Sequence, residues 1–203
     1  MRIVFLGPQG SGKGTQAEII SEMLNTPHIS TGDLLRNSQG DFKKQVDEYM
    51  LKGQLVPDEL MIKILKERIS KPDCKKGFIL DGFPRNLSQA EELENSIEID
   101  KYFEIFISDD EAVKRISGRW NCKNCGMVYN VATSINPKVP GKCDKCNGEL
   151  FQREDDKEEA IKKRLEIYHN ETEPIIEKYD VIRINGKQKI ERVTHDILEK
   201  LDF

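Results

Sequence analysis

Short apolar runs alternate with segments of helical periodicity along most of the chain. Runs of β-branched and aromatic residues, bounded by Gly, Asp or Asn, predict buried strands at 3–6, 28–30, 78–80, 102–107 and 181–184. Apolar positions spaced three and four apart predict helices at 13–24, 60–69, 156–179 and 190–201. This order predicts βαβ units and an α/β fold with a parallel five-stranded sheet flanked by helices.

Two segments interrupt the alternation, and several polar residues mark helix starts. Residues 37–55 are polar with helical spacing, and residues 120–151 are rich in Cys, Gly, Pro and Asn, which predicts a small inserted module. We expect Thr31 or Asp33 to cap one helix, and Asp58 to cap the helix that follows Pro57.

The first predicted strand leads into the glycine-rich run Gly7-Pro8-Gln9-Gly10-Ser11-Gly12-Lys13-Gly14-Thr15. A strand before this spacing and a helix after it are the context of a Walker A phosphate-binding loop. Glycines let backbone N–H groups approach phosphate oxygens, the helix N-terminus favours anions, and Lys13 adds a positive charge. The alternative is an ordinary Gly-rich turn.

The magnesium ligand of this loop is left open by the sequence. Gly14 stands where Ser or Thr usually binds the ion, so either Thr15 takes that task or water and phosphates hold the metal. Asp81, at the end of a buried strand, is the expected water-mediated partner of Mg²⁺. The alternative for Asp81 is a turn-forming Asp-Gly pair.

Four cysteines form two C-x2-C pairs separated by seventeen residues: Cys122, Cys125, Cys143 and Cys146. This spacing predicts a tetrahedral zinc site, and four sulfur ligands leave no open position, so the ion is expected to be structural. A redox pair is the alternative. Cys74 lies apart from both pairs and is expected to be an ordinary thiol.

Composition narrows the classes of function. The 203 residues carry a formal net charge of −4, which argues against the basic footprint of a nucleic-acid-binding protein. No apolar run reaches the length of a membrane span, and the apolar stretch near the N-terminus is too short for a signal peptide. We expect a cytoplasmic monomer whose thiols stay reduced and are free to bind metal.

Arginines follow a predicted strand end and bracket the cysteine module. Arg85 follows the strand that ends at Asp81, and the i,i+4 spacing of Arg115 and Arg119 predicts that they share one face of a helix. Arg153 and Arg164 follow the module. Phosphoryl transfer requires such cations to neutralise the transferred group. The alternative is surface ion pairing, for example Glu111 with Arg115 or Glu154 with Arg153.

Several motifs together resemble those of the long-type bacterial adenylate kinases over essentially the whole chain. The motifs are Gly7–Thr15, Ser30-Thr31-Gly32-Asp33, Leu34-Leu35-Arg36, Gly53-Gln54-Leu55-Val56-Pro57-Asp58-Glu59, Gly77-Phe78-Ile79-Leu80-Asp81-Gly82-Phe83-Pro84-Arg85 and Arg153-Glu154-Asp155-Asp156. Gln9 and Asn86 stand where other residues are commoner in that family.

The resemblance implies a P-loop kinase that transfers phosphate from Mg-ATP to AMP, without nucleic-acid or membrane partners. It implies a core at 1–29, 57–118 and 156–203, a helical monophosphate-binding arm at 30–56 and a zinc-ribbon lid at 119–155. The implied catalytic residues are Lys13, Arg85, Arg119, Arg153 and Arg164.

The same resemblance implies two nucleotide sites. The ATP site would comprise Gly10, Ser11, Gly12, Lys13, Gly14, Thr15 and Arg119, with Val128 and Tyr129 beside the adenosine and the Gln188 backbone at the base. The AMP site would comprise Thr31, Arg36, Gln54, Leu55, Val56, Gly82, Phe83, Pro84, Arg85, Gln89, Arg153 and Arg164. Arg36 and Arg85 would hold the AMP phosphate, Gln89 would contact the adenine edge, and Arg153 and Arg164 would bridge both substrates.

Two other functions stay open at this point. A UMP/CMP kinase has the same fold, and an ATP-dependent zinc-ribbon module that binds nucleic acid is the alternative from another class. The four-thiolate site also accepts iron in place of zinc.

Overall fold

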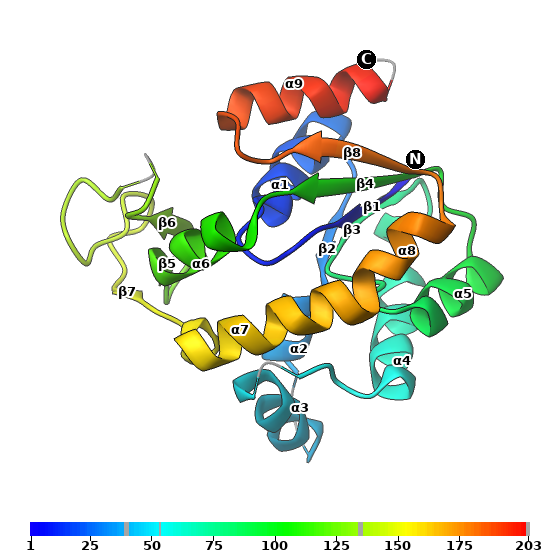
Figure 1. Cartoon of the computed structure of the whole chain (residues 1–203), viewed down its shortest axis with the longest axis horizontal. Helices are drawn as coiled ribbons and strands as arrows, with labels where there is room; N and C mark the ends of the chain where they lie inside the picture. Colours follow the sequence, from blue (N-terminus) through cyan, green and yellow to red (C-terminus); the bar gives the residue numbers. More distant parts are fainter. Residues whose placement is uncertain (39–40, 53, 134–135, 202–203) are drawn as a thin grey trace.

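A parallel five-stranded sheet forms the centre of the computed structural model, which describes residues 1–38, 41–52, 54–133 and 136–201 (Figure 1). In spatial order its strands are β2 (His28–Ser30), β3 (Phe78–Asp81), β1 (Arg2–Leu6), β4 (Lys101–Phe106) and β8 (Val181–Asn185). Every neighbouring pair is parallel. The predicted α/β fold is confirmed.

Helices cover both faces of this sheet because alternate strand residues are apolar on both sides. Ile3 and Phe5 pack with α1 (Lys13–Leu24) and α9 (Ile190–Lys200). Val4 and Leu6 belong to the core of the opposite face. The helices that contribute to that second core are α2 (Thr31–Arg36), α3 (Asp41–Leu51), α4 (Asp58–Ile69), α5 (Leu87–Ser96) and α8 (Glu173–Lys178), with the 3-10 turn Pro72–Cys74.

The predicted helix at 156–179 is not one regular helix. A 3-10 turn (Glu154–Asp156) precedes α7 (Glu158–Ile167), and a π-helical turn (Tyr168–Thr172) joins α7 to α8. Pro174 lies in the first turn of α8 and has no N–H to donate, which explains why the regular α-helical ladder is interrupted there.

The predicted helix caps are corrected by the structure. The Ser30 side chain, and not Thr31 or Asp33, caps α2 by accepting a hydrogen bond from the Asp33 N–H. Pro57 occupies the N-cap of α4, so Asp58 is the first helical residue and its carboxylate is used elsewhere.

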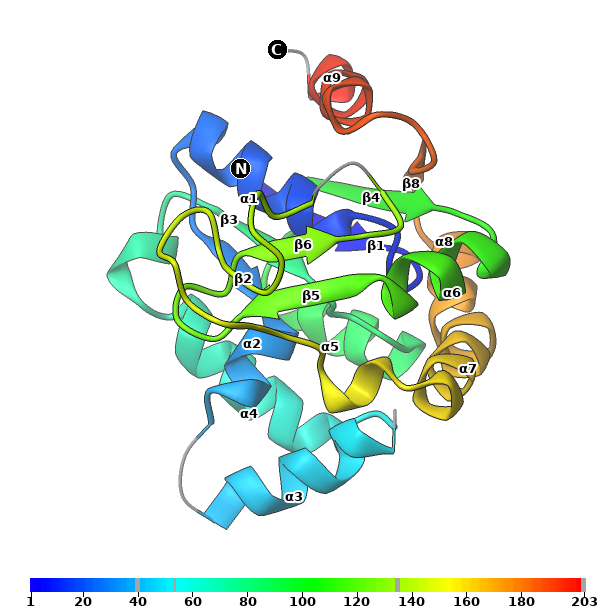
Figure 2. The same cartoon turned by 90° about the vertical axis from the view of Figure 1, so that its left-hand side faces the viewer.

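The cysteine segment forms a small antiparallel sheet beyond the carboxyl ends of the central strands (Figure 1). Its strands β5 (Arg119–Cys122), β6 (Val128–Asn130) and β7 (Leu150–Phe151) lie in the order β6-β5-β7. Figure 2 views the molecule from this side.

The preceding helix α6 (Asp109–Ser117) ends before Gly118, so the prediction that Arg115 and Arg119 share a helix face is wrong.

Among the described residues, no helix is both long enough and apolar enough to cross a membrane.

Candidate active site

The glycine-rich loop joins β1 to α1 at the carboxyl edge of the sheet. Gly7, Gly10 and Gly12 have φ values of 134°, 78° and 100°, which favour glycine. At Gly7 a Cβ would lie 2.3 Å from the Ile105 carbonyl oxygen, so no other residue fits against β4. The sequence thus folds into a tight loop that brings the N-terminus of α1 to the edge where ligands bind in open parallel sheets.

Lys13 is half-buried at the start of α1. Its Nζ donates a hydrogen bond to the Pro8 carbonyl oxygen at 3.1 Å. Burial lowers the pKa of Lys13 to about 8; Asp81 opposes this shift, whereas the charges of Arg85 and Arg164 add to it. The ammonium group is therefore in a site that an anionic ligand would stabilise.

Asp81 ends β3 beside the loop. Burial acts to raise the pKa of its carboxyl, but the neighbouring His28, Lys13 and Arg85 lower it below its usual range, so the group is held as a carboxylate. A Cβ at Gly14 would lie 3.2 Å from Asp81 Oδ2, so the glycine at this position leaves room for the carboxylate. This contact gives a physical reason for Gly14 in place of Ser or Thr.

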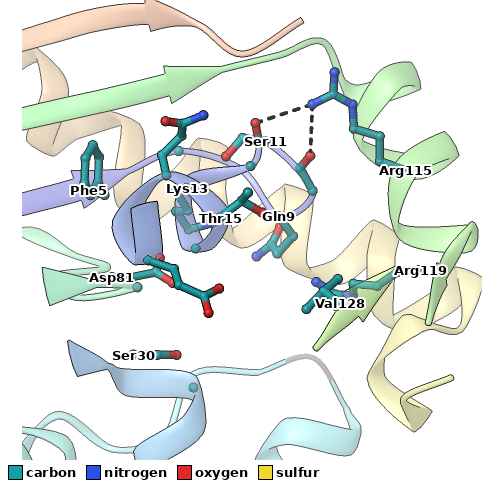
Figure 3. A pocket seen from close by; sticks show the side chains of 18 of the residues that line it. Phe5, Gln9, Ser11, Lys13, Thr15, Ser30, Asp81, Arg115, Arg119 and Val128 are labelled. Carbon is teal, nitrogen blue, oxygen red and sulfur yellow. Dashed lines mark hydrogen bonds between the residues drawn. The ribbon is translucent and has the colours of Figure 1, made fainter. Parts of the chain in front are cut away.

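A single large cavity of about 1370 Å³ extends from the loop to the small antiparallel sheet. Drug-sized pockets have volumes of about 300–1,000 Å³, so this cavity has room for more than one ligand. In Figure 3, Lys13 and Asp81 lie on the side of the central sheet, and Arg119 and Val128 lie on the side of the small sheet. Six arginines from separate segments line it: Arg36, Arg85, Arg115, Arg119, Arg153 and Arg164.

Two of the arginines predicted to be catalytic, Arg119 and Arg164, are held by the acidic turn before α7. Arg119 Nε donates to Asp156 Oδ2 at 2.9 Å. Arg164 donates to the carbonyl oxygen and the carboxylate of Asp155 at 3.0 and 3.1 Å. Asp155 and Asp156 therefore orient arginines and do not cap the helix, which begins after Lys157.

Positive charge is concentrated on this side of the cavity. Burial, together with the charges of Arg119 and Arg36, lowers the pKa of Arg153 to about 10. Burial is also the main reason that the pKa of Arg164 is lowered to about 10. Because both guanidinium groups are desolvated near other cations, a bound phosphate would relieve their mutual repulsion.

Of the two predicted surface pairings, Glu111 does pair with Arg115, whereas Glu154 pairs with Lys157.

A second, small cavity lies beside the first, between α2, α4 and the segment after β3. Its lining brings together most of the predicted AMP-site residues with two further apolar side chains: Thr31, Leu35, Leu55, Val56, Met61, Gly82, Phe83, Arg85 and Gln89. Pro84 and Arg36 line the large cavity, and Leu55, Gly82 and Arg85 line both. Gln54 is exposed and lines neither cavity; Gly53 lies outside the described residues.

The residues predicted to lie beside an adenosine are found in two different environments. Val128 and Gln188 line the large cavity. Tyr129 does not: it is only 1 % exposed, and its hydroxyl contacts Cys143 Sγ at 3.5 Å and accepts from the Asp144 N–H at 2.6 Å. The side chain alternation of β6 accounts for the difference, since neighbouring strand residues face opposite sides. The Tyr129 side chain therefore lies away from the large cavity, and a contact of this residue with a nucleotide stays a prediction.

The four cysteines lie together, with every Sγ within 4.8 Å of the others. Cys122 and Cys146 Sγ atoms are 3.4 Å apart, and those of Cys125 and Cys143 are 3.6 Å apart. Four sulfurs at about 2.3 Å from a tetrahedral zinc would be separated by about 3.8 Å. The donor set and its spacing fit zinc.

Arg115 has a role that its pairing with Glu111 did not indicate. Its guanidinium also donates to the carbonyl oxygens of Gly186, Gly10 and Ser11 at 3.0, 3.4 and 3.4 Å, the last two drawn in Figure 3. These contacts brace the phosphate-binding loop from α6. Only the three-dimensional arrangement brings these groups together, because more than 70 residues separate Arg115 from each part of the loop and from Gly186.

The fold and this loop define a P-loop protein of the nucleoside monophosphate kinase class. A sequence model of the family described as adenylate kinase matches residues 5–184. The chain is 47 % identical to an adenylate kinase of Acetivibrio thermocellus, over 99 % of this chain and 98 % of that protein. It is 48 % identical to one of Caldicellulosiruptor bescii and 47 % identical to one of Archaeoglobus fulgidus, each over 99 % of both chains.

The chain belongs to the adenylate kinase family. The resemblance inferred from the motifs is thereby confirmed.

Proposed function

We propose that the protein catalyses reversible transfer of the γ-phosphoryl group of Mg-ATP to AMP, which yields two molecules of ADP. The observation that carries this proposal is one cavity that joins a Walker-type loop to arginines from separate segments of the chain. An oxygen of the AMP phosphate attacks the γ-phosphorus, and the bond from that phosphorus to the β–γ bridging oxygen breaks. Family membership supports the same conclusion.

On the donor side, residues 10–15 and Lys13 would hold the ATP phosphates, and Arg119 would reach them from β5. Val128 and the Gln188 segment would border the adenosine. Asp81 would contact magnesium through water, and magnesium would neutralise charge on the β- and γ-phosphates. The approach of the Asp81 carboxylate to Gly14 supports this placement.

On the acceptor side, Arg36 and Arg85 would hold the AMP phosphate. Arg85 is aimed by its own backbone surroundings, since its Nε donates to the Gly82 carbonyl oxygen at 2.7 Å and its carbonyl oxygen accepts from Thr172 at 2.8 Å. The small cavity has a volume of only about 20 Å³ in this structure, so its lining residues would have to move apart to border the base. Arg153 and Arg164, between the two sites, would neutralise the group in transfer.

We further propose three functional parts: a core at 1–29, 57–118 and 156–203, a monophosphate-binding arm at 30–56 and a lid at 119–155. Residues 39–40, 53, 134–135 and 202–203 within these ranges lie outside the described structure. Closure of arm and lid over the cavity would exclude water, so that phosphate passes to AMP and not to water.

The four cysteines would hold a structural zinc ion, because a complete sulfur shell leaves no position for substrate. We place the enzyme in the cytoplasm as a monomer that needs no nucleic-acid or membrane partner. The net charge of −4 supports the absence of a nucleic-acid-binding role.

A kinase specific for UMP or CMP is the alternative on the same fold. One coupled assay decides between them: ATP is supplied with AMP, CMP, UMP or GMP as acceptor, and ADP formation is measured for each. We expect the highest kcat/KM for AMP. A higher value for UMP or CMP would overturn the proposed acceptor, and no transfer to any of the four would overturn the proposed reaction.

A further inference from the structure

A closed ring of hydrogen bonds lies beside the small cavity, between the start of α4 and the first turn of α5. Gln89 Nε2 donates to Asp58 Oδ1 at 2.6 Å, and Gln89 Oε1 accepts from the Arg85 N–H at 2.8 Å. Asn86 Nδ2 donates to both carboxylate oxygens of Asp58 at 3.2 and 3.1 Å, and Asn86 Oδ1 accepts from the Gln89 N–H at 2.8 Å. Gln89 is only 2 % exposed.

This ring permits only one orientation of each side-chain amide. A backbone N–H can only donate and a carboxylate can only accept, whereas an amide has a donor end and an acceptor end. Asn86 must place its oxygen on the Gln89 N–H, so its nitrogen faces Asp58. Gln89 must place its oxygen on the Arg85 N–H and its nitrogen on Asp58.

The ring leaves Gln89 one N–H and one oxygen lone pair for a ligand. With the amide fixed, this donor and acceptor suit a base edge that has a ring-nitrogen acceptor beside an exocyclic amino donor. Adenine and cytosine have such an edge, and guanine and uracil have the opposite arrangement. Apolar side chains such as Leu35 and Val56 line the same cavity, and the Thr31 hydroxyl already donates to the Asp81 carbonyl oxygen.

We propose that Asp58 and Asn86 are positioning residues that set the base specificity of the acceptor site by holding the Gln89 amide in one orientation. This inference rests on the proposed function, because it assigns the small cavity to the acceptor base. The Asn86 side chain supplies both an N-cap acceptor for α5 and the amide donor for Asp58.

The test replaces Asp58 by Asn, which offers a donor as well as an acceptor, so that only the Arg85 N–H still fixes the Gln89 amide and its orientation is held less strictly. We expect kcat/KM for AMP to fall about 10-fold, because an unmatched buried polar pair costs about 1–3 kcal/mol. We expect kcat/KM for GMP to rise. KM for ATP and kcat at saturating AMP should stay close to the parent values. Glu59→Gln is the matched control, since Glu59 is an exposed carboxylate in the same helical turn.

A second variant, Asn86→Asp, keeps an oxygen that caps α5 but removes the amide donor and places a like charge against Asp58. It should shift the AMP-to-GMP ratio in the same direction, with folding checked by thermal melting. In a Gln89→Leu background, Asp58→Asn should change the ratio no further.

An unchanged AMP-to-GMP ratio in folded Asp58→Asn would overturn the positioning role, while the proposed function would stand. An equal shift in Glu59→Gln would also overturn it, because charge alone would then account for the effect. Failure of the parent protein to prefer AMP would instead overturn the proposed function, whatever the variants do.

Discussion

The glycine-rich loop and the cysteine segment proposed as a lid both line the same cavity, yet they are held in place by different means. The loop is packed against the central sheet, where a Cβ at Gly7 would collide with the backbone of β4. The lid has a core of only a few buried side chains, among them Cys122, Tyr129 and Leu150. A module with so little apolar burial needs additional stabilisation, which a metal can supply.

Because of this difference, substitutions in the two regions should affect catalytic activity and folding stability separately. Changes in the loop should remove activity and leave folding intact, because the sheet and not the lysine holds the loop. Changes at the cysteines should weaken the lid and leave the phosphate-binding groups in place. The two regions therefore offer opposite tests on one protein.

The largest effect is expected for Lys13→Ala. The charge of Lys13 should stabilise the transferred phosphoryl group, so kcat should fall on the order of 10³-fold, as for other cations at such transition states. The melting temperature should stay the same or rise, because a half-buried, partly desolvated ammonium is removed. Turnover is measured by the coupled assay and folding by circular dichroism. Near-normal kcat would contradict the assigned role.

The loop and the central fold could be predicted from the sequence because their signals are local. A strand, a glycine spacing and a helix follow each other within residues 2–24, and the predicted helix at 13–24 has the observed bounds. Buried parallel strands are apolar on both faces, so their short apolar runs also stood out.

One local signal was missed: α6 ends at Ser117 just before Gly118, a common helix stop, so the i,i+4 spacing of Arg115 and Arg119 did not indicate a shared helix face. Features that depend on distant contacts could not be predicted. The bond from Asp58 to Gln89 spans 31 positions and joins two helices. No local pattern contains such information, because it arises from the packing of α4 against α5.

A large effect on stability is expected for the double variant Cys143→Ser with Cys146→Ser. Zinc binding contributes about 10–16 kcal/mol in zinc-finger peptides, so losing two ligands should lower the melting temperature by roughly 10 °C or more. Kinase activity well below that temperature should remain measurable. Metal analysis should give one ion per chain in the parent and in the control Cys74→Ser. Complete loss of activity in a folded double variant would contradict a structural role.

A smaller effect is expected in the pH dependence of ATP binding, and it tests the protonation of Lys13 in the loop. In the unliganded protein the pKa of Lys13 is lowered to about 8, and bound phosphate should raise it toward the usual value of about 10.4. At a pH between these two values, Lys13 is deprotonated in the free protein and protonated in the complex. ATP binding above pH 8 should therefore take up a proton, and affinity should fall by up to about 10-fold per pH unit. Calorimetry in two buffers of different ionisation enthalpy measures the uptake, which Lys13→Arg should abolish.

The smallest effect is expected for Tyr129→Phe, and it tests which side of the lid this side chain serves. The hydroxyl contacts Cys143 Sγ and accepts from the Asp144 N–H, so its removal deletes hydrogen bonds that orient one metal ligand. Loss of a bond that supports a metal ligand typically lowers metal affinity by about 10-fold or more. Zinc release to a chromophoric chelator should therefore be faster, while KM for ATP should not change, because Tyr129 is buried away from the cavity. Tyr102→Phe is the matched control, since that buried hydroxyl has no hydrogen-bond partner among the described residues. A raised KM for ATP with unaltered zinc release would restore the adenosine contact predicted from the sequence and refute the role at the cysteines.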